Sequence, residues 1–552
     1  MLPNSLLPTL LPKPQFRAVI LCGFGVDLFP LVEPPTPSLS TSSQNDHSQV
    51  QGPGQGQTKA LLPVAGKKMI DWVLERVEQA GVFDIVVLTP DSISKPMGHH
   101  LRARRSTPSS SSHSHPTAKI ELEEIPEEIA SRGTVRVLMW AAEKNLITTD
   151  FILLPCDLLL SPASPSAPSI PLASLLDRHR TDDNLVTTLF SSRSCGNVQE
   201  ARKDGPGEIL TIYDKSTDRL LDIREMDEYD QDEVPLRSSL FDKFPSPTLT
   251  TSLLPTQLYI FSAPVLQVLL MKDSFDSPAI SRRLRSMESV KELVGWIART
   301  NWRKGGREDV SMMQQQRRAG GGECNGGGEL AMGRSTTQLP SYHSNQVGGD
   351  RTQHSRTSRS EPQTPGTTTP TPALTTRNSW LDSKQSSSMN GTGSGSHAQS
   401  RAGSGGCKIV IWSDKDGFCA RGNTVNGWVE LNRAALKLLP PQPPPTSTPS
   451  GVFISPDSYL HPTVYTVMGE KVGVKRCIIG KNSSIGKGTK LTNSVIMENA
   501  VIGENVKLDN CVVSNGVQIR DRAVLKDCEF GRDVVIDFDS QLKGEQLTVG
   551  DE

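Results

Sequence analysis

The chain has 552 residues, and its 59 Lys and Arg side chains almost balance 60 Asp and Glu, which argues against a general attraction to nucleic acid or to membrane surfaces. Its nine cysteines have no CxxC spacing, which argues against a disulfide framework and favours a reducing compartment. No apolar run reaches about eighteen residues and no secretory signal begins the sequence, so a cytosolic protein is expected.

Short apolar segments alternate with amphipathic ones along residues 16–300. The expected strands are Arg17–Cys22, Asp84–Thr89, Phe151–Pro155, Leu185–Phe190 and Gln257–Phe261. The expected helices are Met69–Ala80, which Gly81 ends, Thr134–Asn145, Pro171–Arg180 and Pro264–Met271. This rhythm predicts a mostly parallel, doubly wound α/β sheet, in which ligands bind at the carboxyl ends of the strands.

Polar, low-complexity stretches divide the chain. Residues 33–57 and 102–117 are rich in Ser, Pro, Gln or Gly and are predicted to be flexible insertions. Residues 304–406 carry almost no aliphatic side chains, so burial cannot offset chain entropy and a disordered linker is predicted. Residues 407–439 regain hydrophobic order and are interpreted as a connector, followed by a Pro-rich spacer at 440–450.

The last hundred residues carry a seventeen-residue repeat of aliphatic positions spaced six, six and five apart. The repeat comprises Ile479, Ile485, Leu491, Ile496, Ile502, Leu508, Val513, Ile519, Leu525, Phe530 and Ile536. Such a period is typical of the triangular coils of a parallel β-helix, and a left-handed one is predicted over 451–541.

A second column with the same period holds Cys477, Ser494, Cys511 and Cys528. Small residues at equivalent positions of successive coils indicate a narrow interior column. The alternative, a metal or redox cluster, lacks a histidine in the column.

The stretch 59–89, together with RAVILCGFG at 17–25 and a terminal β-helix, resembles the sugar-nucleotide pyrophosphorylase superfamily. In active members a Gly-rich turn that ends in an Arg shortly before Pro-Leu wraps the nucleotide phosphates. Aligning Pro30-Leu31 with that pair places Gly23 and Gly25 on loop glycines and Asp27 on the Arg. One unit charge at about 4 Å is worth roughly 4 kcal/mol at an effective dielectric near 20, so this inversion weakens phosphate binding severely.

The resemblance implies further remnants of a nucleotide pocket. Lys59 matches a phosphate-contacting Lys and Asp157 a metal-binding Asp, while Gly133 and Thr134 match the start of a Gly-Thr-Ala segment in which Val135 replaces the Ala. The alternative interpretations are a solvated loop lysine and a turn carboxylate. Because no second metal carboxylate can be placed, no catalytic residue and no cofactor are predicted.

Within the superfamily, the chain is most similar to the gamma-subunit family of translation initiation factor 2B. The resemblance rests on 415–439 (KDGFCARGNTVNGWVELNRAALKLL), with Gly417, Cys419, Arg421, Asn432 and Arg433 at matching places. The related epsilon subunit continues past its β-helix into an exchange domain that this sequence lacks. The resemblance implies a non-catalytic subunit that pairs with epsilon and the other subunits, helps bind the GTPase of initiation factor 2, and has no direct nucleic-acid or membrane partner.

Two enzyme hypotheses remain open. An active nucleotidyltransferase acting on a sugar phosphate would use Lys59 and Asp157, but needs a cation in place of Asp27. An acyltransferase shares the β-helix, but usually needs a histidine in the coils, and the last one, His461, precedes the first complete coil. The histidines near the second insertion, at positions 99, 100, 113 and 115, are interpreted as composition rather than metal ligands.

Overall fold

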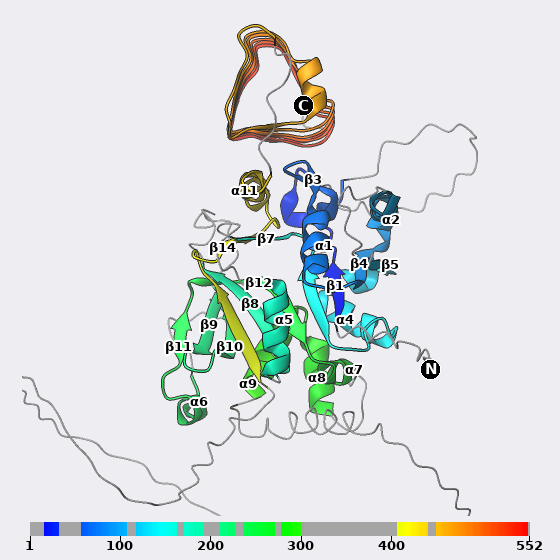
Figure 1. Ribbon diagram of the computed structural model, residues 1–552, viewed down its shortest axis with the longest axis vertical. Coiled ribbons are helices and arrows are strands. Elements are labelled where there is room, and N and C mark those ends of the chain that lie inside the picture. The colour runs from blue at the N-terminus through cyan, green and yellow to red at the C-terminus, as the bar shows by residue number, and fades with distance from the viewer. Residues whose placement is uncertain are drawn as a thin grey trace, which may run out of the picture. The chain divides into compact units, whose positions relative to one another are not determined.

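The computed structural model describes residues 16–32, 57–106, 118–162, 171–182, 184–192, 209–226, 236–270, 278–300, 302, 406–439 and 449–549 (Figure 1). All of them belong to one of the two compact units into which the chain divides, 1–322 together with 401–552. Residues 304–405 of the predicted linker, and most of the insertion at 33–57 and of the spacer, lie outside the described residues.

A ten-stranded mixed sheet forms the first domain, in the order β11-β9-β10-β13-β8-β12-β6-β1-β4-β5. Its strands are β1 (Arg17–Leu21), β4 (Asp84–Pro90), β5 (Lys119–Ile125), β6 (Phe151–Pro155), β8 (Val186–Ser192), β9 (Ile209–Asp214), β10 (Arg219–Glu225), β11 (Thr248–Thr250), β12 (Leu253–Phe261) and β13 (Cys407–Trp412). Strands β6, β1, β4 and β5 run parallel, as predicted, with Ala18 opposite both Ile85 and Ile152. Strand β12 is antiparallel to β6 and β8, so the other half of the sheet is mixed.

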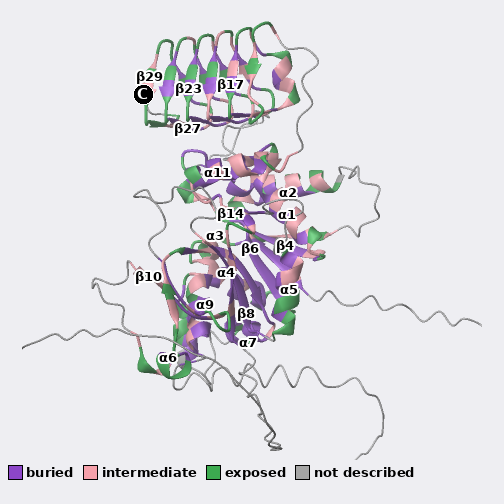
Figure 2. Ribbon diagram, turned by 60° about the vertical axis from the view of Figure 1, so that its left-hand side comes forward, coloured by how far each residue is buried: buried purple, intermediate pink, exposed green. Residues whose placement is uncertain are grey.

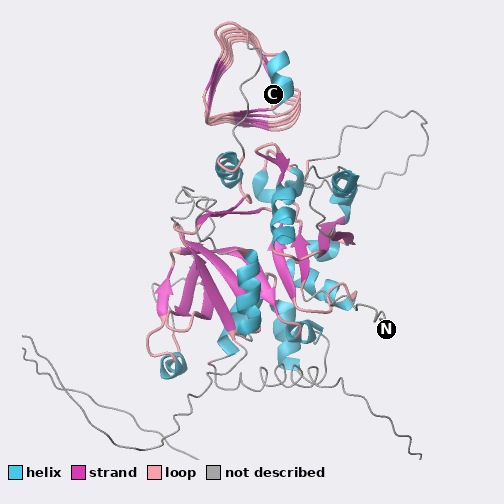
Figure 3. Ribbon diagram, in the orientation of Figure 1, coloured by secondary structure: helices cyan, strands magenta, loops and turns pink. Residues whose placement is uncertain are grey.

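Helices cover both faces of this sheet (Figure 3), which confirms the doubly wound prediction. They are α1 (Met69–Gln79), α2 (Asp91–Ser106), α3 (Glu127–Ala130), α4 (Thr134–Glu143), α5 (Leu172–Thr181), α6 (Ser238–Lys243), α7 (Pro264–Leu270), α8 (Pro278–Ser286) and α9 (Val290–Thr300). Successive side chains of β1 point to opposite faces. Val19 therefore packs in the core with α4, α7 and α9, and Ile20 in the core with α1, α2 and α5.

Helix α2 extends into the predicted insertion at 102–117, whose first residues are therefore helical. Arg104 donates from its two terminal nitrogens to the Glu78 carboxylate on α1 at 2.9 and 3.0 Å. His100 of the same helix contacts Asp71 on α1 at 3.0 Å. These contacts between α1 and α2 could not be predicted from the polar sequence of α2 alone. The rest of the insertion, 107–117, lies outside the described residues.

The predicted connector at 407–439 differs most from expectation, because it is built into the first domain. Strand β13 lies in the sheet between β10 and β8, parallel to β8. Strand β14 (Gly417–Arg421) pairs antiparallel with β7 (Leu158–Pro162), and helix α11 (Val425–Leu436) follows. The Thr424 hydroxyl caps that helix by accepting from the Gly427 amide at 3.1 Å.

Residues 453–547 form three parallel sheets stacked coil on coil, which confirms the β-helix. The first comprises β15 (Phe453–Ile454), β17 (Gly473–Lys475), β20 (Lys490–Thr492), β23 (Lys507–Asp509), β26 (Val524–Lys526) and β29 (Gln541–Lys543). The second comprises β16 (Tyr459–Leu460), β18 (Ile478–Ile479), β21 (Val495–Ile496), β24 (Val512–Val513), β27 (Glu529–Phe530) and β30 (Gln546–Leu547). The third comprises β19 (Ser484–Ile485), β22 (Val501–Ile502), β25 (Gln518–Ile519) and β28 (Val535–Ile536), and all eleven predicted inward aliphatics are buried (Figure 2).

The second column is an interior packing column, as predicted. Each small side chain donates to the carbonyl two residues earlier in its own coil: Cys477 to Lys475 at 3.1 Å, Ser494 to Thr492 at 2.8 Å, Cys511 to Asp509 at 3.3 Å and Cys528 to Lys526 at 3.1 Å. All four are buried. The column thus supports the turn between two faces of the β-helix.

The outward side chains of the three sheets differ in character. On the second sheet Ile478, Val495 and Val512 are only 5–6% exposed, because they pack in one cluster with Leu31 and with Trp428 of α11. On the third sheet the corresponding Val501 and Val535 are 47% and 49% exposed. Among the described coils, the first domain therefore covers the second face and leaves these two valines of the third face exposed. Within the described ranges, no helix is long and apolar enough to cross a membrane.

Candidate functional site

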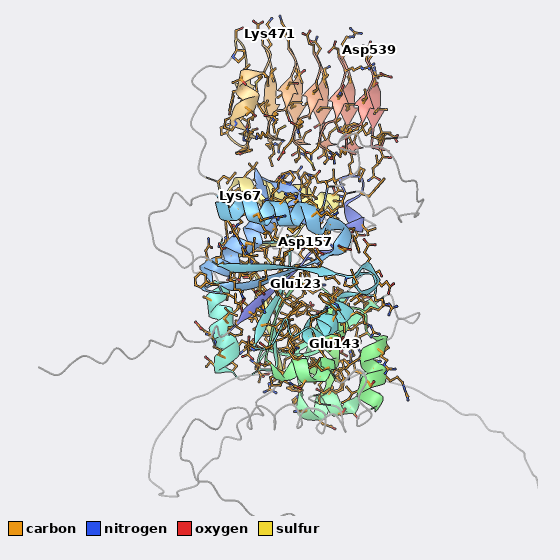
Figure 4. All side chains as sticks on the ribbon, turned by 90° about the vertical axis from the view of Figure 1, so that its right-hand side faces the viewer. Lys67, Glu123, Glu143, Asp157, Lys471 and Asp539 are labelled. Carbon is orange, nitrogen blue, oxygen red and sulfur yellow. The ribbon has the colours of Figure 1, made fainter. Side chains whose placement is uncertain are left out.

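Asp157 lies two residues after the end of β6, at the carboxyl edge of the parallel strands, and is fully buried in the first domain (Figure 4). Two cations from distant parts of the sequence reach its carboxylate. The Lys59 Nζ lies 2.6 Å from Oδ2. Arg421 donates from Nε to Oδ1 and from Nη2 to Oδ2, both at 3.1 Å. The predicted Lys59 and Asp157 are thus brought together, along with a third residue that was not predicted at the site.

Backbone pairing of β14 with β7 positions Arg421 beside Asp157. Strand β14 runs antiparallel to β7 with Arg421 opposite Leu158, and the Gly422 amide donates to the Asp157 carbonyl at 2.9 Å. Lys59 arrives from the other side, as the first residue of the short 3-10 helix η2 (Lys59–Leu61). Arg421 escaped the sequence analysis as a site residue because it is 264 positions from Asp157 and no local pattern links the two.

The site pairs one buried carboxylate with two cations. Burial alone would raise the pKa of the Asp157 carboxyl, but the attraction of Arg421 and Lys59 and their hydrogen bonds outweigh burial and hold that pKa well below its usual range. The carboxylate is therefore charged at neutral pH, with both oxygens occupied. A divalent metal would have to displace two paired cations, so these residues do not suit Mg²⁺. Among the residues described, no cluster of three or more His, Cys, Asp or Glu side chains could hold a metal.

Of the two glycines in the predicted loop, Gly25 lies against Lys59 of the site and Gly23 does not. Gly25 has φ +80°, and a Cβ added there would lie 2.8 Å from the Cβ of Lys59. A glycine at this point leaves room for the lysine stem that reaches Asp157. Gly23 is exposed and a Cβ there would meet nothing within 4 Å. Asp27, in the 3-10 helix η1 (Val26–Leu28), is exposed.

Gly133 and Thr134 contact a different part of the domain, the segment between α8 and α9. Gly133 has φ +100°, and an added Cβ would lie 2.4 Å from the carbonyl oxygen of Glu288. The Thr134 hydroxyl accepts from the Val290 amide at 3.0 Å, and the Val135 amide donates to the Glu288 carbonyl at 3.1 Å. These contacts give both residues a structural role at the start of α4. Their assignment to a nucleotide pocket stays a prediction.

Two buried cysteines, Cys22 and Cys156, lie beside the charged group and were not predicted as partners. Cys22 directly follows β1 and Cys156 directly follows β6. Their hydrogen bond and burial raise the pKa of the Cys22 thiol. Finding this pair would have required predicting, to within about one residue, the register between the strands that begin at Arg17 and Phe151.

Comparison with known proteins identifies the fold family. A family model described as "MobA-like NTP transferase domain" matches residues 52–197, a range that includes Lys59 and Asp157. A second, described as "GMPPB C-terminal domain", matches residues 452–548, the β-helix. A curated relative, "Translation initiation factor eIF2B subunit gamma" of Schizosaccharomyces pombe, is 25% identical over 264 residues.

The chain is similar to the eIF2B gamma-like nucleotidyltransferase superfamily. The aligned residues make up 48% of this chain and 49% of the yeast subunit, so the chain spans about half the length of the relative it matches. The predicted superfamily resemblance is confirmed. In this nucleotidyltransferase-like protein, Arg421 lies outside both matched ranges.

Proposed function

We propose that this chain is a gamma-type, non-catalytic subunit of the translation initiation factor 2B complex, acting in the cytosol. It pairs with the epsilon subunit, joins the other subunits, and helps bind the GTPase of initiation factor 2. The relation to the yeast gamma subunit supports this assignment. The observation that carries the non-catalytic part is the Asp157 carboxylate, whose two oxygens are held by Lys59 and Arg421.

Chemistry on a nucleoside triphosphate requires cations that are free to meet phosphate oxygens and a carboxylate that is free to bind metal. Here the matched lysine and the matched aspartate neutralise each other, and Arg421 completes the pairing. Substrate binding would therefore begin by breaking a buried ion pair. Leaving one buried partner unpaired costs of the order of 3–5 kcal/mol. The exposed Asp27 adds a negative charge to the loop.

The β-helix supports a docking role, since two of its faces are open. The first face presents lysines on successive coils, at positions 475, 490, 507, 526 and 543, all exposed. The third face presents the exposed Val501 and Val535. Flat exposed strand faces of this kind are usual partner surfaces in multi-subunit assemblies.

Co-expression with an epsilon subunit tests the proposal. The isolated full-length chain and the chain with epsilon are compared by size exclusion, and pull-down on this chain from cells is examined for the other subunits and the GTPase. We expect a stable complex with epsilon and recovery of the remaining subunits in similar amounts. A monodisperse chain that forms no complex with epsilon in size exclusion and recovers no subunits in the pull-down would contradict the proposal.

A pyrophosphate-release assay with a panel of nucleoside triphosphates and sugar phosphates addresses the enzyme alternative, because the family model that matches residues 52–197 describes an NTP transferase domain. We expect no turnover above background. Turnover by the purified chain that disappears in Asp157→Ala would establish an active nucleotidyltransferase instead.

A further inference from the structure

Cys22 and Cys156 are neighbours across two parallel strands. The register of β1 and β6 places Leu21 opposite Pro155, and the Cys156 amide donates to the Leu21 carbonyl at 3.1 Å. One step further along, Cys22 therefore stands opposite Cys156. Both side chains belong to the buried cluster on the α1 and α5 face of the sheet, and their thiols form a hydrogen bond.

This placement puts the two residues within the Cα separation of a disulfide. Adjacent strands lie about 4.8 Å apart. Disulfide-bonded cysteines have Cα atoms roughly 4.4–6.8 Å apart and side chains that point toward each other. In the structure both residues are free thiols. Closing the bond therefore requires side-chain rotation rather than displacement of a strand.

We propose that Cys22 and Cys156 are an oxidation site, at which a peroxide converts the two thiols into an intrachain disulfide. One thiol is first oxidised by hydrogen peroxide to a sulfenic acid, and one water is released. The second thiol then attacks that sulfur, the S–S bond forms, and the sulfenic oxygen leaves as a second water. Two thiols and one peroxide thus give one disulfide and two waters.

The buried pair lies next to an exposed residue. Cys22 is 3% exposed and Cys156 1% exposed, so larger reagents are excluded. The next residue, Gly23, is exposed and has nothing within 4 Å of its Cβ position. The disulfide would join the ends of β1 and β6, which lead into Gly25 and Asp157. It would also close a long loop of chain, which raises resistance to unfolding by restricting the unfolded state.

Peptide mapping of the full chain tests the proposal. Reduced protein is treated with hydrogen peroxide, unfolded, alkylated with N-ethylmaleimide and digested without reductant. We expect a linked pair of peptides containing Cys22 and Cys156, and a higher urea midpoint that dithiothreitol reverses. The β-helix thiols of Cys477 and Cys511, whose pKa values burial raises to about 11 and about 12, serve as internal controls that stay reduced. Cys195 and Cys324, outside the described residues, are scored on their own peptides.

Two variants complete the experiment. In Cys22→Ala the linked peptide should disappear, and dimedone added as the protein is unfolded should label the Cys156 sulfenic acid that has lost its partner. Cys407→Ala, a buried cysteine elsewhere in the sheet, should leave the linked peptide unchanged. Recovery of Cys22 and Cys156 as separately alkylated peptides, under conditions that oxidise a reference dithiol, would overturn the proposal. So would oxidation of either residue to a sulfinic acid without the link.

Discussion

Arg421 donates two hydrogen bonds to the Asp157 carboxylate, both at 3.1 Å, although 264 positions separate the residues in the sequence. The contact ties the segment after the long linker to the end of β6, the strand beside β1 in the sheet. It therefore has a structural consequence as well as an electrostatic one. The pairing fixes β14, and with it the start of α11, against the first domain.

Arg421→Met should lower the free energy of unfolding by about 2 kcal/mol. Removing one partner of a buried ion pair costs roughly 3–5 kcal/mol, and the loss here is smaller because Lys59 remains and the Arg421 side chain is 23% exposed. Urea unfolding followed by tryptophan fluorescence measures the change. Arg421→Lys keeps the positive charge but loses the bidentate guanidinium, so its free energy of unfolding should lie between those of the wild type and Arg421→Met. Arg433→Met, which removes a surface pair within α11, is the control and should stay within about 0.5 kcal/mol of the wild type.

The Asp157 contribution should depend on pH in the acid range. Its pKa in the folded chain is depressed, so the stability it contributes is fully present above the unfolded value of about 4 and is lost as the pH falls below it. Asp157→Asn cannot titrate. The difference in free energy of unfolding between wild type and Asp157→Asn should therefore be constant from about pH 5 to 7 and shrink below about pH 4. A difference that is flat down to pH 3 would show that the carboxylate is not stabilised by its two partners.

Local periodicity predicted the elements whose evidence lies in neighbouring residues. The strand before Gly23, the helix that Gly81 ends and the seventeen-residue coils each carry their own hydrophobic pattern, and the structure has all of them. Strand β13 was missed as a member of the sheet because its partners are far away in the sequence, with Cys407 opposite Val186 in β8 and Lys408 opposite Arg219 in β10. The antiparallel strands β9, β10 and β11 were missed as well, because they lie between polar segments.

The candidate site shows the same division. Lys59 and Asp157 could be named because a family pattern marks them, yet their mutual pairing could not be derived from that pattern. Gly133 matched the same pattern, while its contacts with the Glu288 carbonyl depend on how α4 packs against α9. Sequence similarity thus marked the individual residues, whereas tertiary packing determines which of them are in contact.

Gly133→Ala should destabilise the first domain by about 2–4 kcal/mol. The added Cβ would lie 2.4 Å from the Glu288 oxygen, a backbone atom that cannot move aside cheaply, and φ +100° is strained for any residue with a Cβ. Thermal unfolding by circular dichroism reports the loss. Gly23→Ala is the matched control, since its Cβ would enter open space, and it should change stability by no more than about 0.5 kcal/mol. Equal stability of the two variants would leave Gly133 without the structural role assigned here.

Val495→Lys should weaken the packing of the β-helix on α11 by about 2–4 kcal/mol. Val495 is 5% exposed and packs in the cluster that contains Trp428, so a lysine there would bury a charge or separate the surfaces. Val501→Lys makes the same change in the same coil at a side chain that is 47% exposed, and it should be nearly neutral. Limited proteolysis at the 440–448 segment, with thermal melting, compares the two variants. Faster cleavage of Val495→Lys alone is expected, because its β-helix is held less firmly; equal cleavage of both would show that this face contributes little to holding the β-helix on the first domain.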